Sequence, residues 1–475
     1  MGMRRFRRVF ASCLVGLLAA GAGEAYGQWP QFRGPNGSGV DPGSGYPVAF
    51  SPASNVVWKA TIPYGQSSPV VVGSRVYVTA SDGGTLLTIA LDADTGREAW
   101  RRELKRVHDQ KVYRANDPAS PTPAADADGV VVFFPDFGLA AYAPDGKERW
   151  TMPLGPFKSF YGMSASPIIA GDLVVLLCDQ RAGSFVLAVD RKSGKVRWKK
   201  ERPGAAEGWA TPMVFRASAD APAQLVAPGT TRIESYALET GESRWWMPVG
   251  SSGSMGTAVA SGDTLFLSTS GGSEPNLPAF ETVLEKLDAD KNGRLSRQEF
   301  LADKEMGEHF GWVDENADNV IDAREWQTTR MLGMGESGAI AIRAAKVTGK
   351  VDPTSVVWRM KKNLPYIPAP LLYKDVFYLV KTGGIVTSFD PATGRVLKEG
   401  RSPDAPGEYY ASPVAADDKV FLASVDGKVT VLKAGGDWQV AGVNDLGEAI
   451  HATPALGSGR IYVRTRGALY CFGAK

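Results

Sequence analysis

The sequence contains little of the side-chain chemistry that most catalytic and metal centres use. Its 475 residues include only three histidines and three cysteines, and no two cysteines are adjacent. No histidines and cysteines stand at metal-ligand spacing, and there is neither a nucleophile elbow nor a phosphate-binding glycine loop. The motifs of zinc enzymes, serine hydrolases and nucleotide-binding enzymes are therefore missing.

The chain also lacks an apolar run long enough to span a bilayer comfortably. Four arginines precede a short apolar stretch over residues 9–22, and Ala25, Tyr26 and Gly27 form a small-x-small cleavage site. This pattern predicts a signal peptide over residues 1–27, with a transmembrane anchor as the alternative. We expect an exported protein, periplasmic or extracellular, without a transmembrane segment in the mature chain.

Neither sign of charge predominates. The formal net charge is +2, and cleavage would remove four arginines and one glutamate, leaving −1. No basic field remains to attract nucleic acid. Cleavage also leaves only Cys178 and Cys471, both within apolar strand-like runs. Two buried free thiols are the favoured interpretation, and a disulfide in an oxidising compartment is the alternative.

Glycine, by contrast, is abundant at 54 residues, and a unit of about 45 residues recurs along the chain. Each unit has a small residue before proline, apolar strands separated by glycine turns, a short hairpin and usually a tryptophan. Eight starts predict an all-β, eight-bladed β-propeller of four-stranded antiparallel blades. The starts are Ser68-Pro69, Ser120-Pro121, Ser166-Pro167, Thr211-Pro212, Gly256-Thr257, Ala369-Pro370, Ser412-Pro413 and Thr453-Pro454.

The hairpins and tryptophans of the units have structural explanations. In Asp-x-x-Thr/Ser-Gly turns the aspartate folds onto its own backbone, and the glycine adopts a positive φ. Four tryptophans follow a turn glycine by four residues, which indicates packing between blades rather than ligand binding. These tryptophans are Trp100, Trp150, Trp198 and Trp245.

The two ends of the chain are predicted to meet in one blade. Residues 55–59 read Asn-Val-Val-Trp-Lys and resemble residues 355–359, which read Ser-Val-Val-Trp-Arg and end the fifth unit. The eighth unit ends near Phe472 without a tryptophan strand. We therefore expect the N-terminal segment to supply the outer strand of blade 8, which removes exposed sheet edges.

The repeated motif Ala-x-Asp-x-x-Thr/Ser-Gly-x-x-x-Trp resembles that of the pyrroloquinoline-quinone-like (PQQ-like) repeat family over residues 55–270 and 336–473. The family includes quinoprotein dehydrogenases and the outer-membrane assembly factor BamB, both eight-bladed propellers. The lead-in over residues 29–37 also resembles secreted members. We expect it to lie extended on the surface.

One interval between starts is far longer than the others, and it contains two loops that resemble the twelve-residue EF-hand loop. The first loop begins at Asp288, and Gly293 permits its sharp turn. In the second, Asn319 replaces that glycine. Oxygen donors at this spacing predict calcium binding. The predicted ligands are Asp288, Asp290, Asn292, Arg294, Ser296 and Glu299 in the first loop, and Asp314, Asn316, Asp318, Val320, Asp322 and Glu325 in the second.

Leu295 and Ile321 occupy the position that pairs two such loops in a short β-bridge. Only 14 residues separate Glu299 from Asp314, so we expect a shared or shortened helix between the hands. Structural stabilisation by calcium is favoured over a regulatory switch because few methionines are present to line an apolar groove. The predicted domains are a lead-in over 28–54, propeller segments over 55–273 and 336–475, and a helical EF-hand insert in blade 5 over 274–335.

Two classes of function remain after this survey. A PQQ-dependent dehydrogenase would need a stacking tryptophan, calcium held beside the quinone by carboxylate and amide groups, and an aspartate base. Asp136, Asp179 and Asp426 are candidate carboxylates, and His451 is either a channel residue or, as favoured, a hydrogen-bonded structural histidine.

The favoured prediction is a non-enzymatic, monomeric, calcium-binding scaffold that binds a protein, peptide or glycan on a propeller face. The alternatives are the dehydrogenase, with PQQ as cofactor, and a BamB-like assembly factor.

Overall fold

The computed structural model describes residues 28–474, except 111, 114–115, 251–255, 270–276, 305 and 335–336, and gives only the backbone of 331–334. The predicted signal peptide therefore lies outside the described residues, as do both ends of the predicted insert. Within the described chain, no helix combines the length and apolar character needed to cross a membrane.

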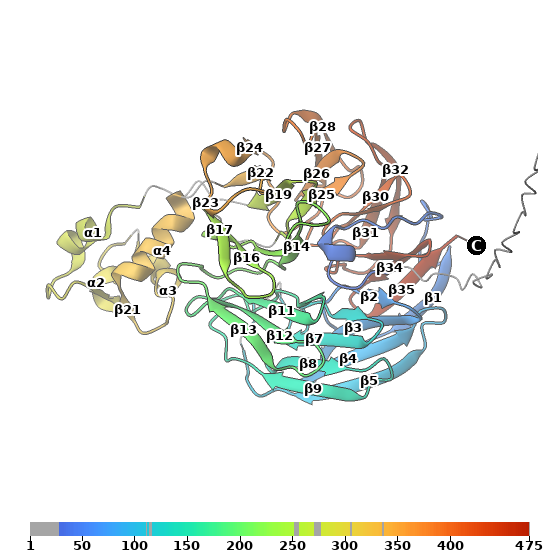
Figure 1. Cartoon of the computed structure of the whole chain (residues 1–475), viewed down its shortest axis with the longest axis horizontal. Coiled ribbons are helices and arrows are strands. Elements are labelled where there is room, and N and C mark those ends of the chain that lie inside the picture. Colours follow the sequence, from blue (N-terminus) through green and yellow to red (C-terminus); the bar gives the residue numbers. More distant parts are fainter. Residues whose placement is uncertain are drawn as a thin grey trace, which may run out of the picture.

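Eight antiparallel sheets are arranged around a central axis as the blades of a propeller (Figure 1). The predicted fold class is confirmed. Blades 1 to 4 comprise β2 (Val70–Val72), β3 (Arg75–Asp82), β4 (Thr85–Asp92) and β5 (Glu98–Lys105); β6 (Ala124–Asp126), β7 (Gly129–Phe134), β8 (Gly138–Tyr142) and β9 (Glu148–Pro153); β10 (Ile168–Ala170), β11 (Leu173–Cys178), β12 (Phe185–Asp190) and β13 (Val196–Glu201); β14 (Met213–Phe215), β15 (Gln224–Ala227), β16 (Arg232–Ala237) and β17 (Ser243–Pro248).

The second half of the ring repeats this arrangement, with two variations. Blade 4 gains a fifth, parallel strand, β23 (Gly349–Lys350), and blade 8 takes its outer strand from the N-terminal segment. Blades 5 to 8 comprise β18 (Val259–Ser261), β19 (Thr264–Thr269), β22 (Gly338–Arg343) and β24 (Val356–Met360); β25 (Leu371–Tyr373), β26 (Val376–Lys381), β27 (Ile385–Phe389) and β28 (Val396–Arg401); β29 (Val414–Ala416), β30 (Lys419–Ala423), β31 (Lys428–Lys433) and β32 (Gln439–Asp445); β33 (Ala455–Gly457), β34 (Arg460–Arg464), β35 (Ala468–Gly473) and β1 (Val56–Thr61).

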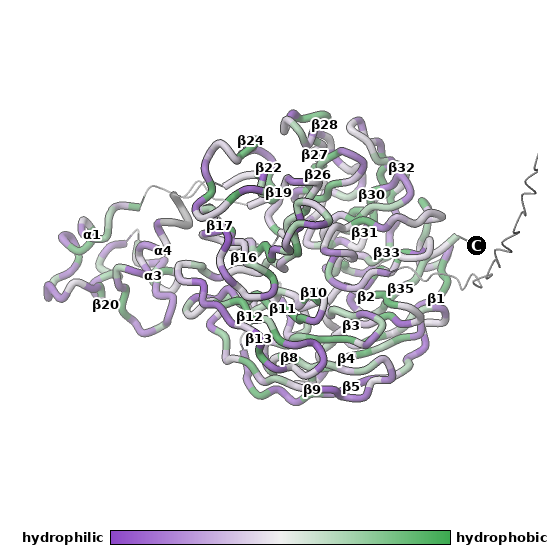
Figure 2. Tube along the Cα trace, in the orientation of Figure 1, coloured by the Kyte–Doolittle hydropathy of each residue, from purple (hydrophilic) through white to green (hydrophobic). Residues whose placement is uncertain are grey.

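Position within a blade determines the residue pattern of each strand. β11 lies between neighbouring blades and is buried along its whole length, so its sequence is a continuous apolar run. The outer strand β13 buries Trp198 at its centre and exposes charged residues beside it. Figure 2 shows the same contrast between the hydrophobic trace of β11 and the hydrophilic segments along β5 and β9.

Tryptophans join neighbouring blades, as predicted. The indole of Trp150 in blade 2 packs against Gly194 in the hairpin of blade 3, and its Nε1 donates to the carbonyl of Arg191 at 2.9 Å. A Cβ added at Gly194 would lie 2.6 Å from the indole, so only glycine fits. Trp245 differs because its Nε1 donates to Gln224 within its own blade. The same indole-on-glycine joint forms between Trp58 and Gly96, Trp100 and Gly146, Trp198 and Gly241, and Trp358 and Gly394.

The ring closes as the sequence predicts, because β1 pairs with β35 and completes blade 8. The second unit differs from the prediction. Its innermost strand β6 begins two residues after Thr122, whereas the other innermost strands begin two residues after the predicted starts or, in blade 5, after Thr257. Two consecutive Ser/Thr-Pro pairs, at Ser120 and Thr122, match the repeat, and only strand pairing identifies the second as the structural start.

The lead-in does not lie on the surface, so that prediction is wrong. Trp29 and Arg33 are completely buried, and the segment contacts several blades. Trp29 pairs with Val71 of blade 1, and Val40 forms a bridge with Ala415 of blade 7. Nη2 of Arg33 donates to the carbonyl of Pro370 at 2.6 Å. The short 3-10 helix η1 (Pro35–Gly37) follows within this segment. The lead-in therefore crosses one end of the ring.

A helical insert lies between β19 and β22 and extends to one side of the ring (Figure 1). Its own apolar core includes Phe300, Phe310 and Trp326. Arg181 in blade 3 fixes its position: Nη2 donates to the carbonyls of Gly311, Trp312 and Asp314 at 2.9–3.0 Å. The elements are α1 (Phe280–Leu287), β20 (Leu295–Ser296), α2 (Arg297–Leu301), η2 (Gly307–His309), α3 (Phe310–Val313), β21 (Val320–Ile321) and α4 (Ala323–Met334), with η3 (Pro353–Ser355) after the insert.

Candidate functional site

Three carboxylates converge in the first predicted calcium loop. Ligand oxygens of Asp288, Asp290 and Glu299 all lie within 4.8 Å of one another. Gly293 has a φ of 78°, and its amide donates to Asp288 at 2.9 Å. At the other end of the loop, the carboxylate of Glu299 accepts from the amides of Ala289 and Ser296 at 3.0 and 2.8 Å. These bonds lower the pKa of Glu299, with the side-chain hydrogen bond from Ser296 as the largest cause.

The second loop repeats this geometry almost bond for bond. Asn319 has a φ of 68°, and its amide donates to Asp314 at 3.0 Å, as Gly293 does to Asp288. Glu325 accepts from the amides of Asn316 and Asp322 at 3.2 and 3.1 Å. Burial raises the pKa of Glu325. Leu295 pairs with Ile321, so the two loops lie back to back.

A different site occupies the central axis, where a ring of hydroxyl groups joins the blades. The amide of Thr453 in blade 8 donates to Oγ of Ser68 in blade 1 at 3.0 Å, and the amide of Ser68 donates to Oγ1 of Thr122 at 3.0 Å. Six such bonds of 2.9–3.2 Å link successive blades. In the remaining four, a backbone amide again donates to a side-chain hydroxyl: Thr122 to Ser166, Ser166 to Thr211, Ala369 to Ser412 and Ser412 to Thr453.

The ring is interrupted where blade 6 has Ala369, which carries no hydroxyl, and the hydroxyl of Thr257 in blade 5 has no partner among the described residues. Each hydroxyl in the six bonds accepts a backbone amide. No described residue accepts the proton that these hydroxyls can donate. The inner wall of the channel therefore presents a set of hydrogen-bond donors.

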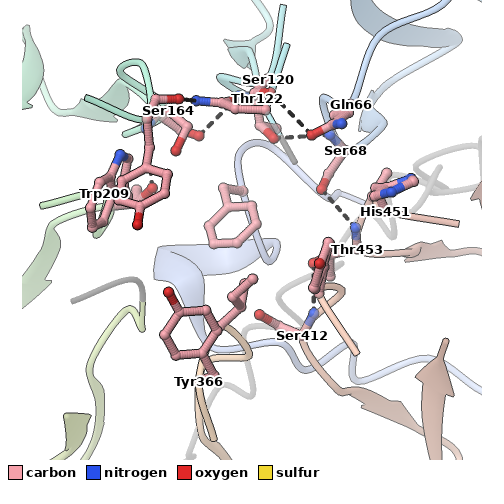
Figure 3. A pocket seen from close by; sticks show the side chains of 18 of the residues that line it. Gln66, Ser68, Ser120, Thr122, Ser164, Trp209, Tyr366, Ser412, His451 and Thr453 are labelled. Carbon is pink, nitrogen blue, oxygen red and sulfur yellow. Dashed lines mark hydrogen bonds between the residues drawn. The ribbon is translucent and has the colours of Figure 1, made fainter. Parts of the chain in front are cut away.

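These hydroxyls line a cavity of about 260 Å³ within the ring (Figure 3). Phe32 of the lead-in also lines it, so this segment forms part of the wall. The loops that precede the innermost strands supply the remaining side chains. These are Gln66, Tyr113, Asn116, Ser120, Tyr161, Ser164, Trp209, Tyr366, Ile367, Tyr410, His451 and Ala452.

Aromatic side chains surround the mouth of this cavity. Tyr161 meets Trp209 and Tyr113 edge to face, with ring centroids 5.5 and 5.1 Å apart. Tyr410 lies 5.6 Å from the imidazole of His451, and Figure 3 places Trp209 and His451 on opposite sides. Half-buried Glu207 holds the loop that carries Tyr161, since its carboxylate accepts from the amides of Phe160 and Tyr161 at 2.7 and 3.2 Å.

None of the described residues that line the cavity is an aspartate, glutamate, lysine or arginine. Burial lowers the pKa of His451 below its ordinary 6.5, and nearby Arg466 lowers it further. Burial and a hydrogen bond to Glu408 raise the pKa of Tyr410 to about 12. The favoured interpretation of His451 as a hydrogen-bonded structural residue is wrong, because it lines the channel.

The lining residues do not fit pyrroloquinoline quinone. Trp209 and Asn116 could stack on a quinone and offer an amide, yet no described carboxylate in the wall could hold calcium or act as a base. Asp179 instead forms a buried ion pair with Arg202, with oxygen–nitrogen distances of 2.7 and 3.1 Å. Buried Asp136 accepts from the amide of Gln110 at 2.9 Å. The candidate carboxylates, including Asp426, are absent from the cavity wall.

Most residues of the channel site were not predicted from the sequence. The serines and threonines of the hydroxyl ring had been recognised only as markers of repeat starts. Trp209, Tyr410 and His451 each stand two residues before a position of the hydroxyl ring, so the repeat spacing offers a signal for them. Tyr113, Tyr161 and Tyr366 share no such offset. Cys178 and Cys471 are free and buried, as favoured.

Comparison with known proteins agrees with the fold. A family model described as outer membrane protein assembly factor BamB matches residues 48–215 and 280–475. The outer membrane protein assembly factor BamB of Burkholderia pseudomallei (strain K96243) is 26% identical over 211 residues, or 42% of this chain and 48% of the relative. The serine/threonine-protein kinase AfsK of Streptomyces griseus is 31% identical over 178 residues, or 35% of this chain and 20% of the relative. The chain thus spans half or less of these curated relatives.

Solved structures share the fold at low sequence identity. BamB from Moraxella catarrhalis has a TM-score of 0.52 at 15% identity, covering 88% of this chain and 98% of that one. A europium-containing methanol dehydrogenase has a TM-score of 0.57 at 13% identity, covering 94% and 98%. The match of the family model to most of the chain is decisive: the protein belongs to the PQQ-like repeat family that this BamB-type model describes.

Proposed function

We propose that this protein is an exported, calcium-binding propeller that binds a partner at its channel mouth and carries out no quinone-dependent oxidation. The observation that carries the proposal is the described cavity wall, which combines aromatic rings and hydroxyl groups without a charged side chain. Such a wall favours binding, because general acid–base and metal chemistry both need groups that ionise.

The family supports a binding role. The description of the family model is that of an outer-membrane assembly factor, and one relative has the same name. A BamB-like role in assembling outer-membrane proteins is therefore the second candidate, with a protein as partner. Export to the periplasm or beyond agrees with both candidates, and N-terminal sequencing of the exported protein is expected to begin at Gln28.

Calcium would have a structural role in this proposal. The first loop brings three carboxylates together beside a small apolar core, and an ion would offset their repulsion. The side-chain oxygens of Asp288, Asp290 and Glu299 would hold calcium in the first loop, and those of Asp314, Asp318 and Glu325 in the second.

Reconstitution tests the proposal against a dehydrogenase. The full chain is incubated with calcium and pyrroloquinoline quinone, freed of excess quinone, and examined for retained quinone absorbance and for dye reduction with primary alcohols and aldoses. We expect neither signal, whereas a purified quinoprotein dehydrogenase treated in parallel gives both. Stoichiometric quinone retention with substrate-dependent dye reduction would overturn the proposed function.

A further inference from the structure

We propose that the channel mouth binds a neutral saccharide, held between the aromatic side chains of the loops and hydrogen-bonded to the hydroxyl ring beneath them. This inference rests on the proposed binding function and specifies its ligand. Three features carry it: the exposed aromatic rings, the unpaired hydroxyl protons and the uncharged wall.

The mouth exposes aromatic surface that the fold itself does not use. Tyr113 is 49% exposed and Tyr366 is 50% exposed, although both line the cavity. Phe160 stacks beside Tyr113 with ring centroids 6.4 Å apart, which extends this surface outward. A pyranose ring presents C–H groups on its faces, and these pack against the electron-rich face of an aromatic ring. The exposed rings therefore suit the faces of a sugar.

Beneath the aromatic rings, the wall offers the hydrogen bonds that the edges of a sugar need. Oγ of Ser68 and Oγ1 of Thr453 each accept one backbone amide and retain a proton to donate. The hydroxyl of Ser164 also lines the cavity and has no partner among the described residues. A sugar hydroxyl both donates and accepts, so it pairs with such groups without leaving a charge unbalanced.

The described wall, which has no charged side chain, favours a neutral saccharide over the alternative ligands. An acidic sugar, a phosphate or a quinone carboxylate would be desolvated against a wall whose described lining residues include no lysine or arginine. A peptide strand would need free backbone partners in register, yet the backbone amides of Ser68, Thr122 and Ser166 are already bonded around the ring. Burial lowers the pKa of His451, so it adds no charge to the cavity lining at pH 7, and its charged neighbours Arg466 and Glu408 are not lining residues.

Isothermal titration of the full chain in calcium tests the inference. The probes are hexasaccharides of β-1,4-linked glucose, mannose, xylose and N-acetylglucosamine, with hexagalacturonate as the acidic comparator. An uncharged decapeptide of serine, asparagine and tyrosine forms a separate arm. At least one neutral hexasaccharide is expected to bind, and hexagalacturonate is expected not to bind.

Substitutions locate the binding. Tyr366→Ala and Tyr113→Ala remove exposed rings and leave the core intact, so both variants are expected to fold. Each should weaken saccharide binding about tenfold, the loss expected for one stacking contact. Trp312→Ala removes an exposed aromatic ring from the insert, at 42% exposure, and serves as the matched control with unchanged affinity.

The outcomes separate this inference from the proposed function. Binding of a neutral hexasaccharide that Tyr366→Ala and Tyr113→Ala weaken supports the inference. Binding of the peptide alone, weakened by the same variants, overturns the saccharide and keeps the binding function. Failure of all four neutral hexasaccharides overturns the inference, as does binding unaffected by the two variants. Quinone retention with dye reduction overturns both.

Discussion

At the scale of single residues, the joints between blades depend on the missing side chain of glycine. Gly194 has a φ of 69°, and its Cα lies against the indole of Trp150. Gly171 has a φ of 61° in the same blade and has open space around it. Alanine substitutions at these two glycines therefore separate two losses of stability, one from a side chain on a left-handed backbone and one from a clash with the indole.

Gly194→Ala is expected to lower the free energy of unfolding by about 2–4 kcal/mol, because the new methyl group both strains the backbone and displaces the indole. Gly171→Ala should cost only about 1 kcal/mol, from the backbone alone. Urea titration followed by tryptophan fluorescence measures both values. Equal costs for the two variants would mean that the indole–glycine contact adds nothing to stability.

His451 gives the channel mouth a predictable dependence on pH. Its pKa is lower in the folded chain than the ordinary 6.5, so the unfolded chain binds more protons between the two values. The stability that this residue contributes is complete above pH 6.5 and is lost as the pH falls through the folded pKa. His451→Gln should therefore lose less stability than the natural chain between pH 7.5 and 5. Parallel losses in urea titrations at the two pH values would contradict this assignment.

At the scale of elements, the insert is joined to a blade other than its own. Arg181 in the loop between β11 and β12 caps three carbonyl groups at the end of α3 and the start of the second loop. It thereby joins blade 3 to the insert, which lies between two strands of blade 5 in the sequence. The backbone carbonyl of Lys158 accepts from the amide of Arg181 at 2.8 Å, so this contact is connected to the loop that carries Tyr161.

Arg181→Met is expected to release the insert from blade 3 and to leave the propeller intact. Limited proteolysis should cut within the insert several times faster, while the free energy of unfolding of the propeller changes by less than about 1 kcal/mol. Arg197→Met removes an exposed arginine from the same blade and is the control, since Arg197 lies in β13 and, among the described residues, forms an ion pair with Asp190 alone. Unchanged cleavage in Arg181→Met would show that other contacts hold the insert.

The two predicted calcium loops should lose calcium binding independently of each other. Glu299→Gln should abolish calcium binding in the first loop and Glu325→Gln in the second, because each removes the carboxylate expected to bind through both oxygens. Titration calorimetry with calcium should detect half of the natural stoichiometry in either variant and none in the double variant. Glu281→Gln, on α1 outside both loops, should bind as the natural chain does. Full stoichiometry in the double variant would refute the ligand assignment.

Local patterns explain which elements could be predicted. The hairpins depend on residues three or four apart, such as Asp190 and Ser193, whose amide donates to that aspartate at 2.9 Å. The proposed ligands of the two loops also follow from a local pattern of closely spaced residues. The buried lead-in could not be predicted, because Arg33 reaches the carbonyl of Pro370, a partner 337 residues away. The channel mouth likewise gathers loops from most of the ring.

At the scale of the whole molecule, one seam holds the two ends of the chain together. β1 and β35 pair along the outer side of blade 8, and the bond from the amide of Thr453 to Ser68 joins blades 8 and 1 at the axis. The bond from the amide of Ala369 to Ser412 has the same geometry but joins two blades that are consecutive in the chain. Substitutions of Ser68 and Ser412 therefore separate the effect of closing the ring from the effect of losing one hydrogen bond between neighbouring blades.

Ser68→Ala and Ser412→Ala should each cost about 1–3 kcal/mol, since each leaves a buried amide without an acceptor. Their effects on local opening should differ. Without the bond at the seam, the C-terminal strands of blade 8 can separate from β1 and from blade 1, so amide hydrogen exchange along β35 and β1 is expected to accelerate in Ser68→Ala. In Ser412→Ala the faster exchange should be confined to β25 and β29, because the chain connection still holds blades 6 and 7 together. Unchanged exchange along β35 in Ser68→Ala would mean that strand pairing alone closes the ring.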